Sequence, residues 1–64
     1  MKTHKCMTID TGCLTFECIH HHDDKTNPFW LYYTDGKHRR LVDKFGDRKS
    51  VLATVLDYMT FGTL

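Results

Sequence analysis

The segment FWLYYTDGKHRRLVDKF, residues 29–45, consists of two runs of strand-forming residues on either side of Asp35-Gly36. Aromatic and β-branched residues favour the pleated, half-buried surface of a β-strand. An Asp-Gly pair tolerates the positive φ angles that a tight hairpin turn requires. The segment therefore predicts a β-hairpin.

The residues before this segment predict another hairpin. Met7 and Ile9 alternate with polar residues before positions 11–12, and Phe16 and Cys18 alternate with polar residues after them. If the Thr-Gly pair at positions 11–12 forms a two-residue loop, Met7 pairs with Phe16 and the apolar side chains share one face. This is the register that we expect.

Residues 46–62, GDRKSVLATVLDYMTFG, predict a helix. Asp47 is the expected N-cap, because its side chain can accept hydrogen bonds from the first backbone N–H groups. Gly62 is expected to end the helix, since glycine readily adopts the left-handed conformation. Five apolar residues recur at helical spacing and predict one apolar stripe, formed by Val51, Leu52, Val55, Leu56 and Met59.

Together these elements predict an α+β fold in the order ββββα. Two hairpins form a four-stranded antiparallel sheet, a polar loop at residues 21–28 joins them, and one C-terminal helix packs on one face. With 64 residues the chain is expected to be a single small domain, residues 1–64, near the lower limit of independent stability. One helix covers only one face of the sheet, so the other face is expected to contact water or a partner.

Composition argues against several classes of protein. Hydrophobic residues make up 41% and charged residues 27%, which is typical of a globular domain, and the net charge of +1 creates no strong field. Three cysteines without a CxxC pair argue against a disulfide scaffold and indicate a reducing compartment. We recognise neither a secretion signal nor an apolar stretch of membrane-spanning length. We therefore expect a cytoplasmic protein without a membrane segment.

The stretch FECIHHHDD raises the question of a metal site. On a strand, Cys18, His20 and His22 share one face at intervals of about 6.5 Å, a spacing that a metal could use. Zinc usually requires four converging ligands. In the expected register His4 and Cys6 lie on the opposite face, so they could join only through a bulge or a different register.

We therefore expect no bound metal and no cofactor. Cys18 would then pack as a small apolar residue, and the histidines would form a solvated strand end. A zinc-stabilised domain that uses Cys18, His20 and His22 is the alternative.

Catalysis is not expected. The chain contains no GxSxG, HExxH, P-loop or GxGxxG motif that would place a nucleophile, a base or a phosphate-binding loop. A chain of this size also has few residues from which to build the walls of a substrate pocket. The sequence therefore predicts a protein that is not an enzyme.

The hairpin at residues 29–45 carries large apolar side chains on both faces, because five of them are consecutive. The expected assignment buries Phe29, Leu31 and Phe45 beneath the helix. Trp30 and Tyr32 then lie on the other face.

An arginine is expected beside these aromatic residues whichever loop connects the strands. A two-residue loop places Arg39 beside Tyr32. A three-residue bulged loop places Arg40 beside Trp30.

Tryptophan, tyrosine and arginine are enriched where protein interfaces concentrate their binding energy. We therefore predict a small binding or regulatory protein with a protein partner. An accessory inhibitor of a host protein, of the kind that bacteriophages encode, is one form of this function, and a homodimer through the same face is another. The candidate binding residues are Trp30, Tyr32, Lys37, His38, Arg39 and Arg40.

Two other interpretations remain open. Single-stranded DNA or RNA could bind to the same surface, with bases stacked on the aromatic rings and phosphates near the basic residues. The near-neutral net charge and the nearby Asp35 and Asp43 favour a protein partner. Alternatively, Trp30 belongs to the core and KHRR at residues 37–40 is a charged edge strand that discourages aggregation.

Overall fold

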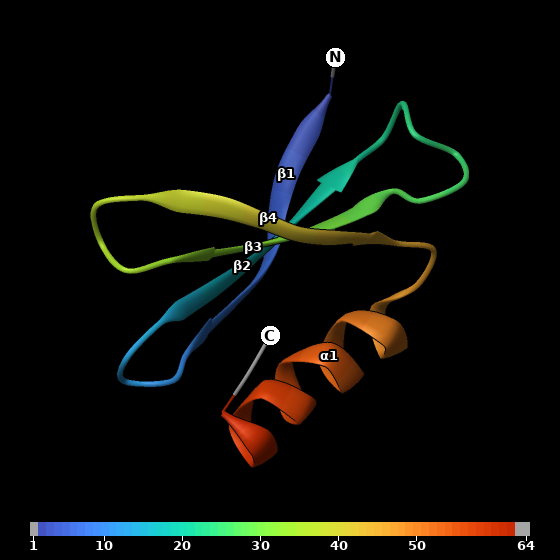
Figure 1. The fold of residues 1–64 in the computed structure, drawn as a ribbon. Coiled ribbons are helices and arrows are strands. Elements are labelled where there is room, and N and C mark those ends of the chain that lie inside the picture. The colour runs from blue at the N-terminus through green and yellow to red at the C-terminus, as the bar shows by residue number, and fades with distance from the viewer. Residues whose placement is uncertain (1, 63–64) are drawn as a thin grey trace.

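The computed structural model describes residues 2–62, which form four strands followed by one helix (Figure 1). The strands form one antiparallel sheet in the order β1-β2-β3-β4, so each strand pairs with its neighbours in the chain. The predicted α+β fold and the ββββα order are confirmed. The elements are β1 Thr3–Asp10, β2 Thr15–His21, β3 Phe29–Thr34, β4 Arg39–Phe45 and α1 Arg48–Phe61.

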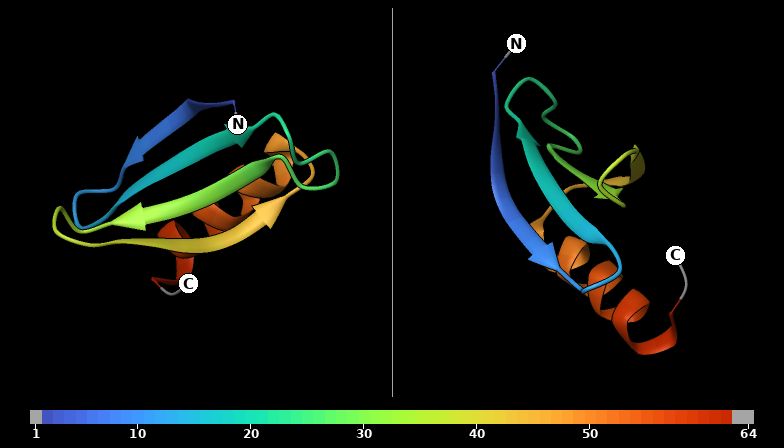
Figure 2. Two further views of the ribbon diagram at one scale, coloured as in Figure 1. Left: turned by 90° about the horizontal axis from the view of Figure 1, so that it is seen from above. Right: turned by 90° about the vertical axis from the view of Figure 1, so that its left-hand side faces the viewer.

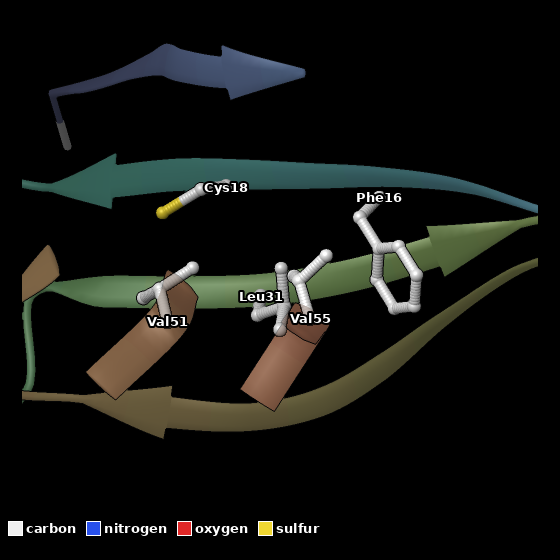
Figure 3. Close-up of a cluster of buried hydrophobic side chains, with 5 residues drawn as sticks. All are labelled: Phe16, Cys18, Leu31, Val51 and Val55. Carbon is white, nitrogen blue, oxygen red and sulfur yellow. The ribbon is translucent and has the colours of Figure 1, made fainter. Parts of the chain in front are cut away.

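Helix α1 lies against one side of the sheet and leaves the other side uncovered, as the two views in Figure 2 show. We call the uncovered side the open face. The core lies between α1 and the two central strands β2 and β3 (Figure 3). Its fully buried side chains are Phe16, Cys18, Leu31, Val51 and Val55.

Both ends of α1 have the predicted caps. The Asp47 carboxylate accepts a hydrogen bond from the backbone N–H of Ser50 at 2.9 Å, and this bond lowers the pKa of the carboxyl group. Gly62 has a φ of 70°, in the left-handed region, and its N–H donates to the carbonyl oxygen of Tyr58. Both helix ends therefore follow from local chemistry.

The predicted apolar stripe of α1 is only partly correct. Val51 and Val55 are buried, whereas Leu52, Leu56 and Met59 are 47%, 61% and 58% exposed. Leu52 and Leu56 each follow a buried valine by one position, and successive residues of a helix are rotated by about 100°, so these two side chains turn away from the sheet. The sheet contacts a single row of α1, and a second apolar row remains exposed.

The β1–β2 hairpin has a different register from the expected one. Met7 pairs with Cys18 and Ile9 with Phe16, so the connection spans residues 11–14 instead of two residues. The predicted Met7–Phe16 pair is therefore wrong by two positions. Because side chains alternate with a period of two, this shift keeps the apolar residues on the same face.

A β-bulge interrupts β1 at Cys6. Lys5 pairs with Ile19 and Met7 pairs with Cys18, so Cys6 is the additional residue. The Cys6 thiol donates to the carbonyl oxygen of Cys18 at 3.5 Å. The bulge reverses the alternation of the residues that precede it.

Because of this reversal, the expected position of His4 is wrong. The regular register placed His4 across from Ile19, on the face opposite His20. In the structure His4 pairs directly with His20. His4 therefore lies on the same face as the histidines from which the expected register had excluded it.

A second bulge lies in the β3–β4 hairpin at Val42, because Tyr32 pairs with Leu41 and Leu31 pairs with Asp43. The loop of this hairpin covers residues 35–38, which is longer than either predicted loop. The Asp35 carboxylate closes it by accepting hydrogen bonds from the backbone N–H groups of Lys37 and His38, both at 2.9 Å.

Among residues 2–62, no helix combines the length and the apolar character that crossing a membrane requires.

Candidate binding surface on the open face

Trp30 lies on the open face, as expected from its alternation with the buried Leu31. Its ring stacks on the His21 ring with a centroid distance of 3.6 Å, and its indole N–H donates to the Asn27 carbonyl oxygen at 2.9 Å. The Lys44 ammonium group lies 4.0 Å from the centre of the indole ring. Trp30 is therefore held in place by neighbours from both flanking strands.

Tyr32 lies further along the same face. The Arg39 guanidinium group lies 4.2 Å from the centre of its ring, which is a cation–π contact. Leu41 is directly across the strand pair from Tyr32 and is 45% exposed. An aromatic ring, an aliphatic side chain and a guanidinium group thus form one continuous surface.

A carboxylate lies within this surface. Glu17 pairs with Tyr32, and its carboxylate lies 2.8 Å from the Lys5 ammonium and 3.7 Å from Arg39 Nε. The hydrogen bond from Lys5 and the charge of Arg39 lower the pKa of Glu17. Glu17 therefore stays ionised at neutral pH and balances part of the positive charge. The open-face patch is defined as Glu17, Trp30, Tyr32, Arg39, Leu41 and Lys44.

The structure brings together three of the six candidate binding residues, namely Trp30, Tyr32 and Arg39. Arg40 pairs with Tyr33, whose side chain packs against the core, so Arg40 lies on the side that α1 covers. The four-residue loop places Arg40 across from Tyr33. The bulge at Val42 places Lys44 across from Trp30, beside which a three-residue loop would have placed Arg40. The other two candidates, Lys37 and His38, are in the exposed β3–β4 loop, beyond the strand ends.

Sequence reasoning missed Glu17 and Leu41 as members of the open-face patch, and Lys5 and His21 as residues that contact it. The alternation of side chains along a strand could have placed Glu17 on the open face, because it lies between the buried Phe16 and Cys18. The position of Lys5 on the open face depends on the strand register, which the sequence does not specify. His21 alternates with His20 and His22 and was therefore left out of the predicted metal site, but its contact with Trp30 was not foreseen.

A hollow of about 350 Å³ adjoins Trp30 at the end of the open-face patch. The Asp24 carboxylate shapes the loop beside it by accepting hydrogen bonds from the N–H groups of Thr26 and Asn27 at 3.2 and 2.9 Å. Among the described residues, neither ring nitrogen of His21 has a hydrogen-bond partner. The hollow is lined by His21, Asp23, Asp24, Lys25 and Trp30.

The residues considered as zinc ligands are separated by the fold. Cys18 is 1% exposed beneath α1, and burial, with the nearby Cys6, raises the pKa of its thiol to about 12. The Cys18 sulfur is not among the potential ligand atoms that the described residues bring within 4.8 Å of one another. His20 and His22 instead lie close to His4. We call His4, His20 and His22 the histidine cluster.

No protein-family model, curated protein or solved structure matches this chain.

Proposed function

We propose that this chain is a small non-enzymatic binding protein that engages a protein partner through the open-face patch. The observation that supports this proposal is that the half-buried rings of Trp30 and Tyr32 lie with the exposed Arg39 and Leu41 on the one sheet face that α1 leaves uncovered. Tryptophan, tyrosine and arginine are enriched among the few residues that contribute most of the binding energy in protein interfaces. A regulatory or inhibitory role would follow from occupying a functional surface of the partner.

The size of the molecule is compatible with this role. Its two longer dimensions are 31 and 24 Å. A standard interface buries about 800 Å² on each partner, and one whole face of a molecule with these dimensions is of that order. Engagement of most of the open face would therefore suffice for a specific complex.

The contacts within the open-face patch favour a protein over single-stranded nucleic acid. Lys44 and Arg39 already lie over the rings on which bases would have to stack, and Glu17 pairs with Lys5 and Arg39. A phosphate chain would have to compete with this carboxylate for the same cations. A protein surface can instead contact the exposed ring edges and Leu41 without breaking these pairs.

Site-specific photo-crosslinking in extracts of the source cell tests the proposal. A photoreactive phenylalanine analogue replaces Leu41 on the open face or, as the matched control, Leu56 on the exposed side of α1. We expect one defined protein adduct from position 41 and none from position 56. Adducts that form only from position 56 would contradict the proposal.

Direct binding to the identified protein completes the test. We expect Tyr32→Ala and Leu41→Ala each to weaken binding about tenfold, equivalent to about 1.4 kcal/mol, and Leu56→Ala to leave it unchanged. Fluorescence anisotropy with single-stranded DNA and RNA at increasing salt tests the alternative. Tight binding that falls steeply with salt would favour nucleic acid instead.

A further inference from the structure

Three imidazole rings converge at one end of the β1–β2 pair. The centroid of the His4 ring lies 5.1 Å from that of His20 and 4.9 Å from that of His22, and the His20 and His22 centroids are 4.2 Å apart. His4 Nδ1 and His22 Nε2 are 2.8 Å apart, which is a hydrogen bond in which one nitrogen carries the proton. One potential ligand nitrogen from each ring lies within 4.8 Å of the other two.

The backbone holds the three rings in this arrangement. The bulge at Cys6 places His4 directly across from His20. His22 follows His20 by two residues, and its N–H donates to the Lys2 carbonyl oxygen at 3.0 Å, which extends the β1–β2 pairing beyond the end of β2. The His20 ring stacks on Phe29 with a centroid distance of 4.7 Å. Two strands and one aromatic neighbour therefore position the histidine cluster.

The spacing of the nitrogen atoms suits a transition-metal ion. Zinc binds imidazole nitrogen at about 2.0–2.1 Å, so two nitrogens of a tetrahedral site lie about 3.4 Å apart. His4 Nδ1 and His22 Nε2 are 2.8 Å apart, and one ligand atom from each of the three rings lies within 4.8 Å of the other two. Small rotations of the exposed His4 and His22 side chains would bring all three nitrogens to one ion.

We propose that His4, His20 and His22 form a binding site for a divalent transition-metal ion, for which zinc is the best match. Hard cations such as magnesium and calcium prefer oxygen ligands, so they are not expected to bind. The described residues supply three ligands, which leaves the fourth tetrahedral position to water or to a group of another molecule. By coordinating residues from both strands, the ion cross-links β1 and β2 at the end of the sheet.

Isothermal titration of zinc chloride into untagged, metal-free protein tests the site. We expect one ion per chain, and magnesium chloride as the control ion should give no binding. His4→Gln should weaken zinc binding about tenfold or more, since loss of even an outer-shell partner commonly costs about 10–100-fold in affinity. His38→Gln and Cys13→Ser, at exposed positions outside the histidine cluster, should leave zinc binding unchanged.

Cobalt substitution distinguishes this ligand set from one that includes Cys18. A tetrahedral cobalt(II) site with nitrogen ligands gives visible ligand-field bands, whereas a thiolate ligand adds an intense near-ultraviolet charge-transfer band. We expect the visible bands without the charge-transfer band, and their loss in His4→Gln. Absence of binding, an intense thiolate band, or equal binding by His4→Gln and wild type would each overturn the proposal.

Discussion

His4 on β1 lies directly across from His20 on β2, although an uninterrupted register would place their side chains on opposite faces of the sheet. One additional residue, Cys6, produces this relationship. Bulges commonly redirect side chains at functional positions. Here the bulge brings three histidines together at the end of the β1–β2 pair, where we propose the metal site.

Zinc is expected to raise the thermal stability of the protein. Ligand at 100 times its dissociation constant stabilises a folded state by about 2.7 kcal/mol. In a domain of this size 1 kcal/mol shifts Tm by about 4–8 °C, so we expect an increase of roughly 10–20 °C. Circular dichroism melts with and without zinc measure the shift. The increase should disappear with EDTA and in His4→Gln but persist in His38→Gln.

Acidification is expected to destabilise the metal-free protein through His20. The pKa of His20 in the folded protein is lower than its ordinary value of 6.5, so the unfolded chain binds a proton at a higher pH than the folded chain does. The free energy of unfolding therefore falls as the pH drops below about 6.5 towards the lowered pKa. Urea denaturation between about pH 7.5 and pH 5 measures this slope. We expect His20→Gln to flatten it, and identical slopes in variant and wild type would contradict the prediction.

Replacement of Arg48 is expected to strengthen zinc binding. Arg48 is in the first turn of α1, and its positive charge contributes to the lowered pKa of His20. The same charge repels a bound cation. Exposed unit charges interact by only about 1 kcal/mol at 4 Å in water, so we expect the dissociation constant of Arg48→Gln to fall by less than tenfold. Calorimetry measures this change, with Lys49→Gln as the matched control; an unchanged or weaker affinity in Arg48→Gln would contradict the prediction.

Two leucines that differ in burial should respond differently to truncation. Leu31 is 1% exposed in the core, whereas Leu56 is 61% exposed on α1. Leu31→Ala should lower the free energy of unfolding by about 2–5 kcal/mol, because it removes apolar contacts and leaves a cavity. Leu56→Ala should change it by less than about 0.5 kcal/mol. Urea denaturation measures both, and similar losses in the two variants would indicate that Leu56 is covered in solution.

Local chemistry was sufficient to predict the elements of this fold. Asp47 and Gly62 mark the helix ends because their effects depend only on the adjacent turn. The alternation around Leu31 assigned Trp30 and Tyr32 to the open face, since a strand has a side-chain period of two. Each of these features depends on residues a few positions apart, so the printed sequence contains the necessary information.

The strand registers and the contacts between elements could not be obtained in this way. The bulge at Cys6 brings His4 across from His20, and the bulge at Val42 brings Lys44 across from Trp30. The four-residue loop places Arg40 across from Tyr33, away from the open-face patch. A bulge forms when pairing and packing across several strands together favour one additional residue. Such a balance of long-range contacts exists only in the folded chain, and for this reason both candidate sites became defined only once the sheet and helix were assembled.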